Sequence, residues 1–386
     1  MTDASADDER ATGSNRLGLP RTIATGFGLL SVAFGIWGFW TNFVGPIGVD
    51  FVSFWAAGKL TLAGHASAAY DIAVHRHVEQ TVVPHVGLLP FPYPPPFLIA
   101  VTPFALAPFT WAFVIWIVIT CIFYVLSARS FVPWPYALAN PPGLLNFLIG
   151  QTGFLTSGLF LAGLALLQPA PFVAGAILGL LIIKPQLALL LPVAMLAGRQ
   201  WRAIAGAILS ISVALLTAFA LFGLDAYRSF LHILPTYVGY MRNNSWEWIE
   251  LASPFAFLRY LNVAPAIALA AQMFVASVAA LVTFIAWWRN WEEKVAILAA
   301  ATLLMSPYLL TYDALLLIVP AALCVARKWW WRLTLLWVLS ALPIVHFYGL
   351  YEGPNTIPVA ALLSISFVAA PHVNRRIADR LGYAIA

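Results

Sequence analysis

The sequence has few charged residues and very few cysteines. Only 9% of its 386 residues are Asp, Glu, Lys or Arg, and 62% are hydrophobic, whereas soluble globular proteins carry about 25% charged residues. Because so few charges do not cover a water-facing surface, the composition excludes a soluble protein and predicts one embedded in a membrane. Cys121 and Cys324 lie inside apolar runs, which excludes a disulfide framework and a cysteine-based zinc site.

Signatures of several ligand classes are also missing. The net charge is +5, but the basic residues form no block or stripe of the kind that binds nucleic acid. No glycine-rich nucleotide fingerprint is present. His75 and His77 lack the further ligands that a zinc site needs. We therefore expect no metal, no cofactor and no nucleic-acid partner.

Long uncharged stretches predict the class of fold. They read as an all-α polytopic membrane protein, a bundle of roughly 10–12 transmembrane helices in contact with membrane lipids. The apolar run that follows residue 21 has no small-residue cleavage site, so a retained first helix is expected rather than a signal peptide. The predicted segments are a cytoplasmic N-terminal tail (1–21), a transmembrane domain (22–371) with external loops at about 43–95 and 223–262, and a cytoplasmic C-terminal tail (372–386).

Proline predicts where one of these passages breaks. Pro185 forbids a continuous helix, so residues 172–183 and 186–197 are expected as two short segments hinged at Lys184. Residues 146–167 and 203–222 are each expected as one uninterrupted passage. Short, broken segments at membrane depth are tolerated where neighbouring helices bury them or where they line a cavity. The short, broken segments therefore indicate a functional site at membrane depth.

Charge placement predicts the orientation. Cytoplasmic loops are enriched in Lys and Arg, and placing the N-terminus inside puts 13 of the 20 basic residues on the cytoplasmic side. Most of the acids beyond the N-terminal tail then fall on the external side, and four of the seven histidines lie together in the first external loop (His65, His75, His77 and His85). The sequence thus predicts that both termini are cytoplasmic and that the active site faces outward.

The first external loop contains the strongest candidate for catalysis. Phe51, Phe54, Trp55 and Gly58 form an apolar stripe at helical spacing, which predicts a helix lying on the membrane face. Asp50 stands at its start, where an acid either caps the helix or serves as a general base for a lipid-borne substrate. Both interpretations fit the residue.

Other polar residues at membrane depth or in the external loops are further candidates. Lys184 is either a lysine that snorkels to the interface or a cation for a lipid phosphate. Asp313, in the segment that follows Ser306-Pro307, is the second credible base or orienting carboxylate. Arg242 and Arg259 are donors suited to sugars or phosphates, and His346 precedes the last external turn; for each of these three the alternative is simple surface solvation.

Taken together, these residues resemble glycosyltransferase family 87, polytopic glycosyltransferases of the GT-C architecture that include polyprenol-phosphate-mannose-dependent α-mannosyltransferases. The motifs follow one another in family order over most of the chain. The second external loop and the part of the chain beyond Asp313 contain no motif specific to the family. The matching motifs are Asp50-Phe51, Trp55-Ala56-Ala57, Ala63-Gly64 to Tyr70-Asp71, Tyr93-Pro94-Pro95, Gly150-Gln151, Ala174-Gly175 through Gly179-Leu180 to Lys184-Pro185-Gln186, and Ser306-Pro307-Tyr308 to Tyr312-Asp313.

The resemblance implies an activity and an arrangement of residues. Such proteins transfer a sugar, with inversion, from a polyprenyl-phosphate donor to a lipid or glycan acceptor at the outer face of a bacterial-type inner membrane. It implies Asp50 as the base, and it places Tyr93, Gln151, Lys184, Gln186 and Tyr312 in matching motifs. Where many family members carry Trp-Asp-His, this sequence has Tyr312-Asp313 followed by alanine, so no histidine occupies that position.

Two other functions remain compatible with the sequence. A transporter or flippase also uses broken helices and midplane charges, although the motifs here show no repeat between the two halves. An enzyme that moves whole glycans from lipid diphosphates shares the architecture and differs only in its donor. Substrate flux across a bilayer without covalent change would favour the transporter. The identity of the lipid-linked donor distinguishes the enzyme that moves whole glycans.

Overall fold

The computed structural model describes residues 22–30, 33, 36–37, 48–85, 87, 89–243, 248–346 and 351–381, with side chains up to residue 370. The expected tail of residues 1–21 and the last five residues lie outside this part. The helices are α2 (Phe51–Leu62), α3 (Ile72–Gln80), α4 (Pro96–Val101), α5 (Phe109–Ala128), α6 (Trp134–Leu138), α7 (Pro142–Ile149), α8 (Gly153–Leu166), α9 (Pro171–Gly179), α10 (Leu191–Ala197), α11 (Trp201–Asn243), α12 (Pro254–Tyr260), α13 (Pro265–Trp288), α14 (Lys294–Thr302), α15 (Ile318–Ala326), α16 (Trp330–His346) and α17 (Ile357–Leu381).

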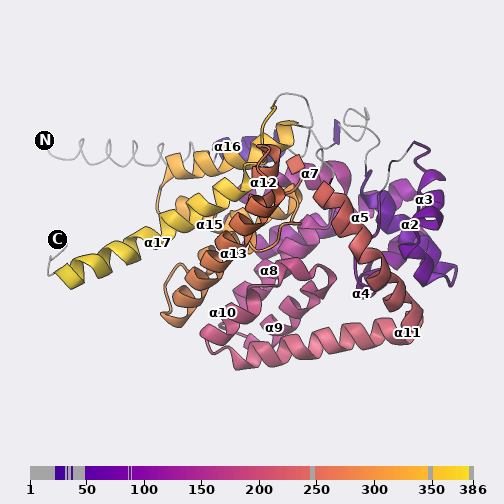
Figure 1. Ribbon diagram of the computed structural model, residues 1–386, viewed down its shortest axis with the longest axis horizontal. Coiled ribbons are helices and arrows are strands. Elements are labelled where there is room, and N and C mark those ends of the chain that lie inside the picture. The colour runs from indigo at the N-terminus through magenta and orange to yellow at the C-terminus, as the bar shows by residue number, and fades with distance from the viewer. Residues whose placement is uncertain are drawn as a thin grey trace, which may run out of the picture.

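Short 3₁₀ helices connect several of these elements, and every element labelled in Figure 1 is a helix. Within the described residues there is no β-strand, and the isolated bridge between Leu251 and Leu310 is the β-pairing found there. The protein is therefore an all-α membrane protein, as the composition predicts. The 3₁₀ helices are η1 (Ala66–Tyr70), η2 (Thr102–Leu106), η3 (Leu180–Ile183), η4 (Pro185–Leu187) and η6 (Thr311–Leu317).

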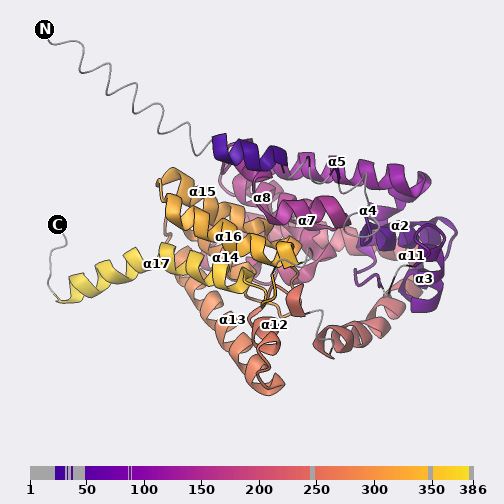
Figure 2. The same ribbon diagram turned by 90° about the horizontal axis from the view of Figure 1, so that it is seen from above.

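Three of the described helices, α5, α11 and α13, are long and apolar enough to cross a membrane. Shorter apolar helical runs accompany them, among them the segment 171–183 and the segment 185–197. The two segments meet at Lys184, whose backbone leaves the helical region just before Pro185. This break lies where the proline predicts it. Figure 2 shows α17 extending beyond the other helices towards the C-terminus.

The chain departs from the sequence prediction after residue 222, where a loop is expected. Gly223 has φ 72 and ψ 178, a conformation open to glycine because it has no Cβ. The chain turns there and then stays helical to Asn243, so α11 bends sharply (Figure 1). The expected external loop therefore begins with a second helical arm, and Ile233 and Tyr237 of that arm are buried against the rest of the protein.

Helix α2 is buried on nearly every side, not along one stripe as the sequence suggests. It packs against η1, α3, α4 and η2, and Gly58 approaches η2 so closely that a Cβ there would lie 2.7 Å from the Cβ of Ala105. Its rings join a cluster of aromatic side chains in which Phe54 lies 5.3 Å from Tyr93 and 5.6 Å from Trp116, measured between ring centroids. This packing holds the N-terminus of α2, and with it Asp50, in a fixed position.

Candidate active site

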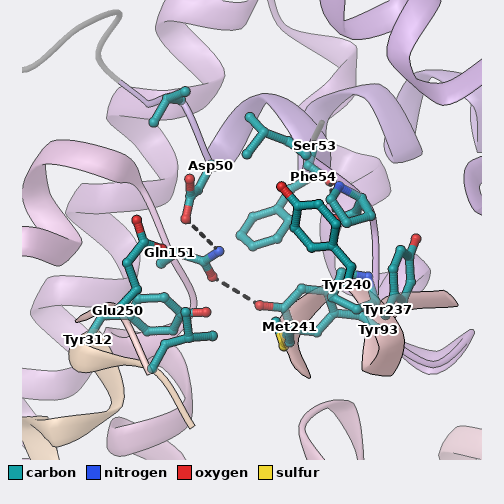
Figure 3. Close-up of a pocket in the computed structure, with 15 residues that line it drawn as sticks. Asp50, Ser53, Phe54, Tyr93, Gln151, Tyr237, Tyr240, Met241, Glu250 and Tyr312 are labelled. Carbon is teal, nitrogen blue, oxygen red and sulfur yellow. Dashed lines mark hydrogen bonds between the residues drawn. The ribbon is translucent and has the colours of Figure 1, made fainter. Parts of the chain in front are cut away.

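A cavity of about 260 Å³ lies at the N-terminus of α2. Six separate parts of the chain meet around it, and aromatic rings form much of its wall (Figure 3). Such a cavity, mostly apolar with a few converging polar groups, is the usual form of a small-molecule site. The residues that line it are Val49, Asp50, Ser53, Phe54, Leu89, Pro90, Pro92, Tyr93, Gln151, Tyr237, Tyr240, Met241, Glu250, Leu310 and Tyr312.

The carboxylate of Asp50 is held by a side chain 101 positions away in the sequence. Its Oδ2 accepts a hydrogen bond of 2.9 Å from Nε2 of Gln151, and it makes no side-chain capping bond to α2. Its backbone N–H donates to the carbonyl of Ile149. The helix-capping interpretation of this residue is therefore wrong, because the carboxylate turns away from the helix and towards the cavity.

Gln151 links Asp50 to Tyr93. The hydroxyl of Tyr93 donates to Oε1 of Gln151 at 3.0 Å, and the backbone N–H of Thr152 donates to the same oxygen at 3.0 Å. With its oxygen occupied in this way, the amide presents its NH₂ group to Asp50, as Figure 3 shows. Burial raises the pKa of Tyr93 above its usual value, so the phenol stays protonated as a donor.

Burial also changes the basicity of Asp50. Desolvation raises its pKa from 3.8 to about 6, against the lowering effects of the Gln151 hydrogen bond and the positive charge of Lys184. The negative charge of Glu79 raises it further. Near neutral pH such a group is still mostly ionised, yet it binds a proton more readily than an ordinary aspartate, which suits a general base.

Gln151 reaches Asp50 because the predicted passage 146–167 is broken. Gly150 has φ +77 and ends α7, and α8 begins at Gly153. The left-handed conformation costs glycine less than residues that have a Cβ, and here it coincides with a close approach to α2. If α7 and α8 formed one continuous helix, the backbone at residue 151 would follow the helix axis, and the side chain of Gln151 would not extend across the cavity to Asp50.

Replacing Gly150 by Ala is therefore expected to destabilise the protein. The new Cβ would lie 2.6 Å from the Cβ of Phe51, so overpacking of about 1–3 kcal/mol adds to the cost of about 1–2 kcal/mol for a left-handed alanine. Gly64 is the matched control, because it has φ +82 with nothing within 4 Å. We expect Gly150→Ala to lower the melting temperature of the purified protein clearly more than Gly64→Ala, and equal shifts would contradict the close packing.

A buried ion pair lies behind the ring of Tyr312. Nζ of Lys184 donates to Oδ1 and Oδ2 of Asp313 at 2.6 and 2.8 Å, and it lies 4.3 Å from the centroid of the Tyr312 ring. Lys184 is 2% exposed and Asp313 0%, and neither lines the cavity. Lys184 does not snorkel to the interface; it and Asp313 hold the cavity wall from behind.

The structure also brings in residues that the sequence did not single out for the site. Glu250 lines the cavity, and the Leu251–Leu310 bridge positions its backbone beside η6. Tyr237, Tyr240 and Met241 enter from the second arm of α11. Glu250 could be counted among the external acids, but its backbone partner Thr311 is 61 positions away in the sequence and no local pattern points to it.

A second polar cluster lies behind the wall formed by Ser53. Its Oγ donates to the carbonyl of Pro90 at 3.2 Å and lies 3.1 Å from Nε2 of His75. The same nitrogen is 3.2 Å from Oε1 of Glu79, a carboxyl whose pKa is raised by burial. In a hydrolytic triad the acid and the nucleophile use different ring nitrogens, so this arrangement does not activate Ser53 as a nucleophile.

The remaining candidates lie outside the cavity wall. Arg242 is exposed and directly follows Met241 of the wall. Arg259 stacks on Trp248 at 4.4 Å and donates to the carbonyl of Val263. Gln186 is half-buried in η4, and Nδ1 of His346 lies 2.7 Å from the carbonyl oxygen of Tyr351. Within the described residues no group of three or more possible metal ligands is found.

Comparison with known proteins shows which family the chain belongs to. No curated protein and no solved structure matches the chain. A model of glycosyltransferase family 87 matches residues 91–307, more than half of the sequence. The match includes Tyr93, Gln151 and Lys184, whereas Asp50 and Asp313 lie outside it. This chain belongs to glycosyltransferase family 87.

Proposed function

We propose that this glycosyltransferase transfers a hexose, with mannose the first sugar to test, from a polyprenyl-phosphate donor to a lipid or glycan acceptor. The reaction inverts the anomeric carbon and uses Asp50 as the general base. The observation that carries the proposal is the Asp50 carboxylate, which lines a cavity, is fixed by Gln151, and has a pKa of about 6. We place the site at the external face of a bacterial-type inner membrane.

The chemistry needs one base and a stabilised leaving group. The acceptor hydroxyl oxygen attacks the anomeric carbon while the bond from that carbon to the phosphate oxygen breaks. Asp50 takes the hydroxyl proton, and polyprenyl phosphate leaves with the bonding electron pair. Because the leaving group is already an anion, it needs a cation or hydrogen-bond donors but no acid catalyst.

Arg242 is our candidate for the cation that binds the donor phosphate. Lys184 is neutralised by both oxygens of Asp313, and Arg259 is engaged with Trp248 and Val263. Arg242 is exposed, and its chain neighbour Met241 forms part of the cavity wall. An arginine in this position is suited to bidentate contact with a phosphate.

The aromatic wall is suited to a sugar bound beside the base. Rings of Phe54, Tyr93, Tyr237, Tyr240 and Tyr312 surround the cavity. Aromatic side chains combine a large apolar face with, in tyrosine, a hydroxyl that forms hydrogen bonds. A hexose has both kinds of surface, with C–H groups on its faces and hydroxyls around its rim, so this lining fits one sugar ring.

The test is transfer by the purified protein in proteoliposomes. We expect label from a polyprenyl-phosphate-[¹⁴C]hexose to appear in an acceptor lipid with release of polyprenyl phosphate, and no transfer from the matching nucleotide sugar. If sugar is transferred from a polyprenyl diphosphate and not from a polyprenyl phosphate, the proposed donor is wrong and the diphosphate takes its place. Movement of the labelled lipid across the bilayer without covalent change would contradict the proposed reaction altogether.

The rate of transfer is expected to depend on pH through Asp50. The base is active when ionised, so kcat/KM should rise with pH, reach half of its plateau near the pKa of about 6, and level off above it. Gln151→Leu removes a hydrogen bond that lowers this pKa, so its midpoint should move to higher pH. Gln80→Leu, outside the cavity, is the control. A flat profile between about pH 5 and about pH 8, or a midpoint that falls in Gln151→Leu, would contradict this assignment.

A further inference from the structure

Another cavity, with a polar lining, lies where two turns of the chain meet. Figure 1 shows these turns on the side of the molecule away from α2 and α3. One turn joins α10 to α11 and the other joins α13 to α14, and α10 packs against both α11 and α13. The turns touch so closely that a Cβ on Gly198 would lie 2.9 Å from Cε3 of Trp287. The cavity has a volume of about 400 Å³.

The lining of this cavity is cationic. Arg199 and Lys294 both line it, together with the amide side chains of Gln168, Gln200 and Asn290. No acid lines it, and neither cation forms an ion pair with another described residue. Lys294 is oriented by a hydrogen bond to Asn290 and by the ring of Trp287, 5.1 Å from its Nζ. An anion bound here would find two cations and several amide donors.

The cavity lies at the end of two apolar helices that are long enough to cross a membrane. Trp201 starts α11 and Trp288 ends α13, and their side chains are 62% and 59% exposed. Exposed tryptophans at the ends of apolar helices lie at the level of the lipid headgroups. Basic pockets at this level between membrane helices bind anionic lipid headgroups.

A separate apolar groove lies between α10 and α11, close to the same turn. It has a volume of about 280 Å³ and is lined by Leu191, Met195 and Leu196 of α10 and by Ile204 and Ile208 of α11. Leu196 lies next to Ala197 of the polar cavity along the chain. A polar, cationic chamber followed by a groove of aliphatic side chains has the chemistry of a phospholipid, with a charged headgroup and an acyl chain, rather than that of free phosphate.

We propose that this pair of cavities binds one anionic phospholipid of the surrounding membrane. Arg199 and Lys294 bind its phosphate, and one acyl chain lies in the groove between α10 and α11. The site is separate from the cavity at Asp50 and shares no lining residue with it. The proposal does not depend on which sugar the enzyme transfers.

Native mass spectrometry of the delipidated protein with added lipid tests this site. We expect dioleoylphosphatidylglycerol to bind more tightly than dioleoylphosphatidylcholine and to raise the melting temperature, since a ligand of the folded state stabilises it. Removing both cations with Arg199→Asn and Lys294→Gln should weaken phosphatidylglycerol binding about 25-fold. Asparagine is chosen because residue 199 has φ 53, a conformation that asparagine tolerates.

A matched control separates the cavity from the general charge of this surface. Arg202→Gln with Arg289→Gln also removes two exposed cations near the turns, neither of which lines the cavity, and should leave most of the affinity. Equal losses in the two double variants, or equal binding of the two lipids, would overturn the proposal. So would displacement of the lipid by millimolar inorganic phosphate, because the acyl groove would then contribute nothing. If the first double variant fails to fold, Lys294→Gln alone carries the test, with an expected loss of about fivefold.

Discussion

Asp50→Asn is expected to lower the kcat of sugar transfer by about 10²–10⁴ while the protein stays folded and inserted. Asparagine has the size of aspartate, and its carbonyl oxygen can still accept the hydrogen bond from Gln151 that Oδ2 accepts now. It cannot take a proton from the acceptor hydroxyl. Because the contacts around the sugar are otherwise unchanged, the KM for the donor should move by only a few-fold, and steady-state rates in proteoliposomes measure both parameters.

The matched control is Asp225→Asn, which removes another carboxylate outside the cavity. Asp225 is 81% exposed and pairs with Arg228 on the same face of α11, so its loss should cost about 1 kcal/mol of stability or less and leave kcat close to that of the wild type. An Asp50→Asn protein with near wild-type turnover would remove Asp50 from the mechanism. In that case Glu250, the other carboxylate that lines the cavity, becomes the base to test.

Local patterns in the sequence predict the membrane class, one helix break and one residue of the candidate site. Uncharged runs predict an all-α membrane protein, Pro185 predicts the break at Lys184, and the position of Asp50 points to a functional acid. These features depend on composition or on neighbours in the chain, so they can be recognised from the sequence without knowledge of the fold. Motifs of the family resemblance point to Tyr93 and Gln151, and the structure places both in the cavity wall with Asp50.

What the sequence does not reveal depends on contacts between distant segments. Lys184 and Asp313 are 129 positions apart, and either alone reads as a free charge at membrane depth. In the sequence Gly150 is simply a small residue that permits helix packing, whereas in the structure it has a positive φ at a point of close approach to α2. The second arm of α11 is polar enough to resemble a loop, and its helix becomes evident only once Ile233 and Tyr237 are buried by the rest of the fold.

Breaking the Lys184–Asp313 pair is expected to have the largest effect on stability. Lys184→Met leaves the carboxylate of Asp313 buried with the Leu310 N–H as its remaining hydrogen-bond donor among the described residues. An uncompensated buried charge costs about 3–5 kcal/mol. Asp313→Asn, which leaves Lys184 without its counter-ion, should cost a similar amount. Unfolding by dodecyl sulfate in mixed micelles measures the free energy of each variant.

The double variant separates the cost of a lone charge from the value of the pair itself. Lys184→Met with Asp313→Asn buries no net charge, and the asparagine oxygen can still accept from the N–H of Leu310, so most of the lost stability should return. Arg228→Met with Asp225→Asn, an exposed pair, should change stability by about 1 kcal/mol or less. If the double variant costs as much as the two single variants together, the pair is not the reason for their instability. If it folds, its pH profile should have a midpoint above that of the wild type, because the charge of Lys184 lowers the pKa of Asp50.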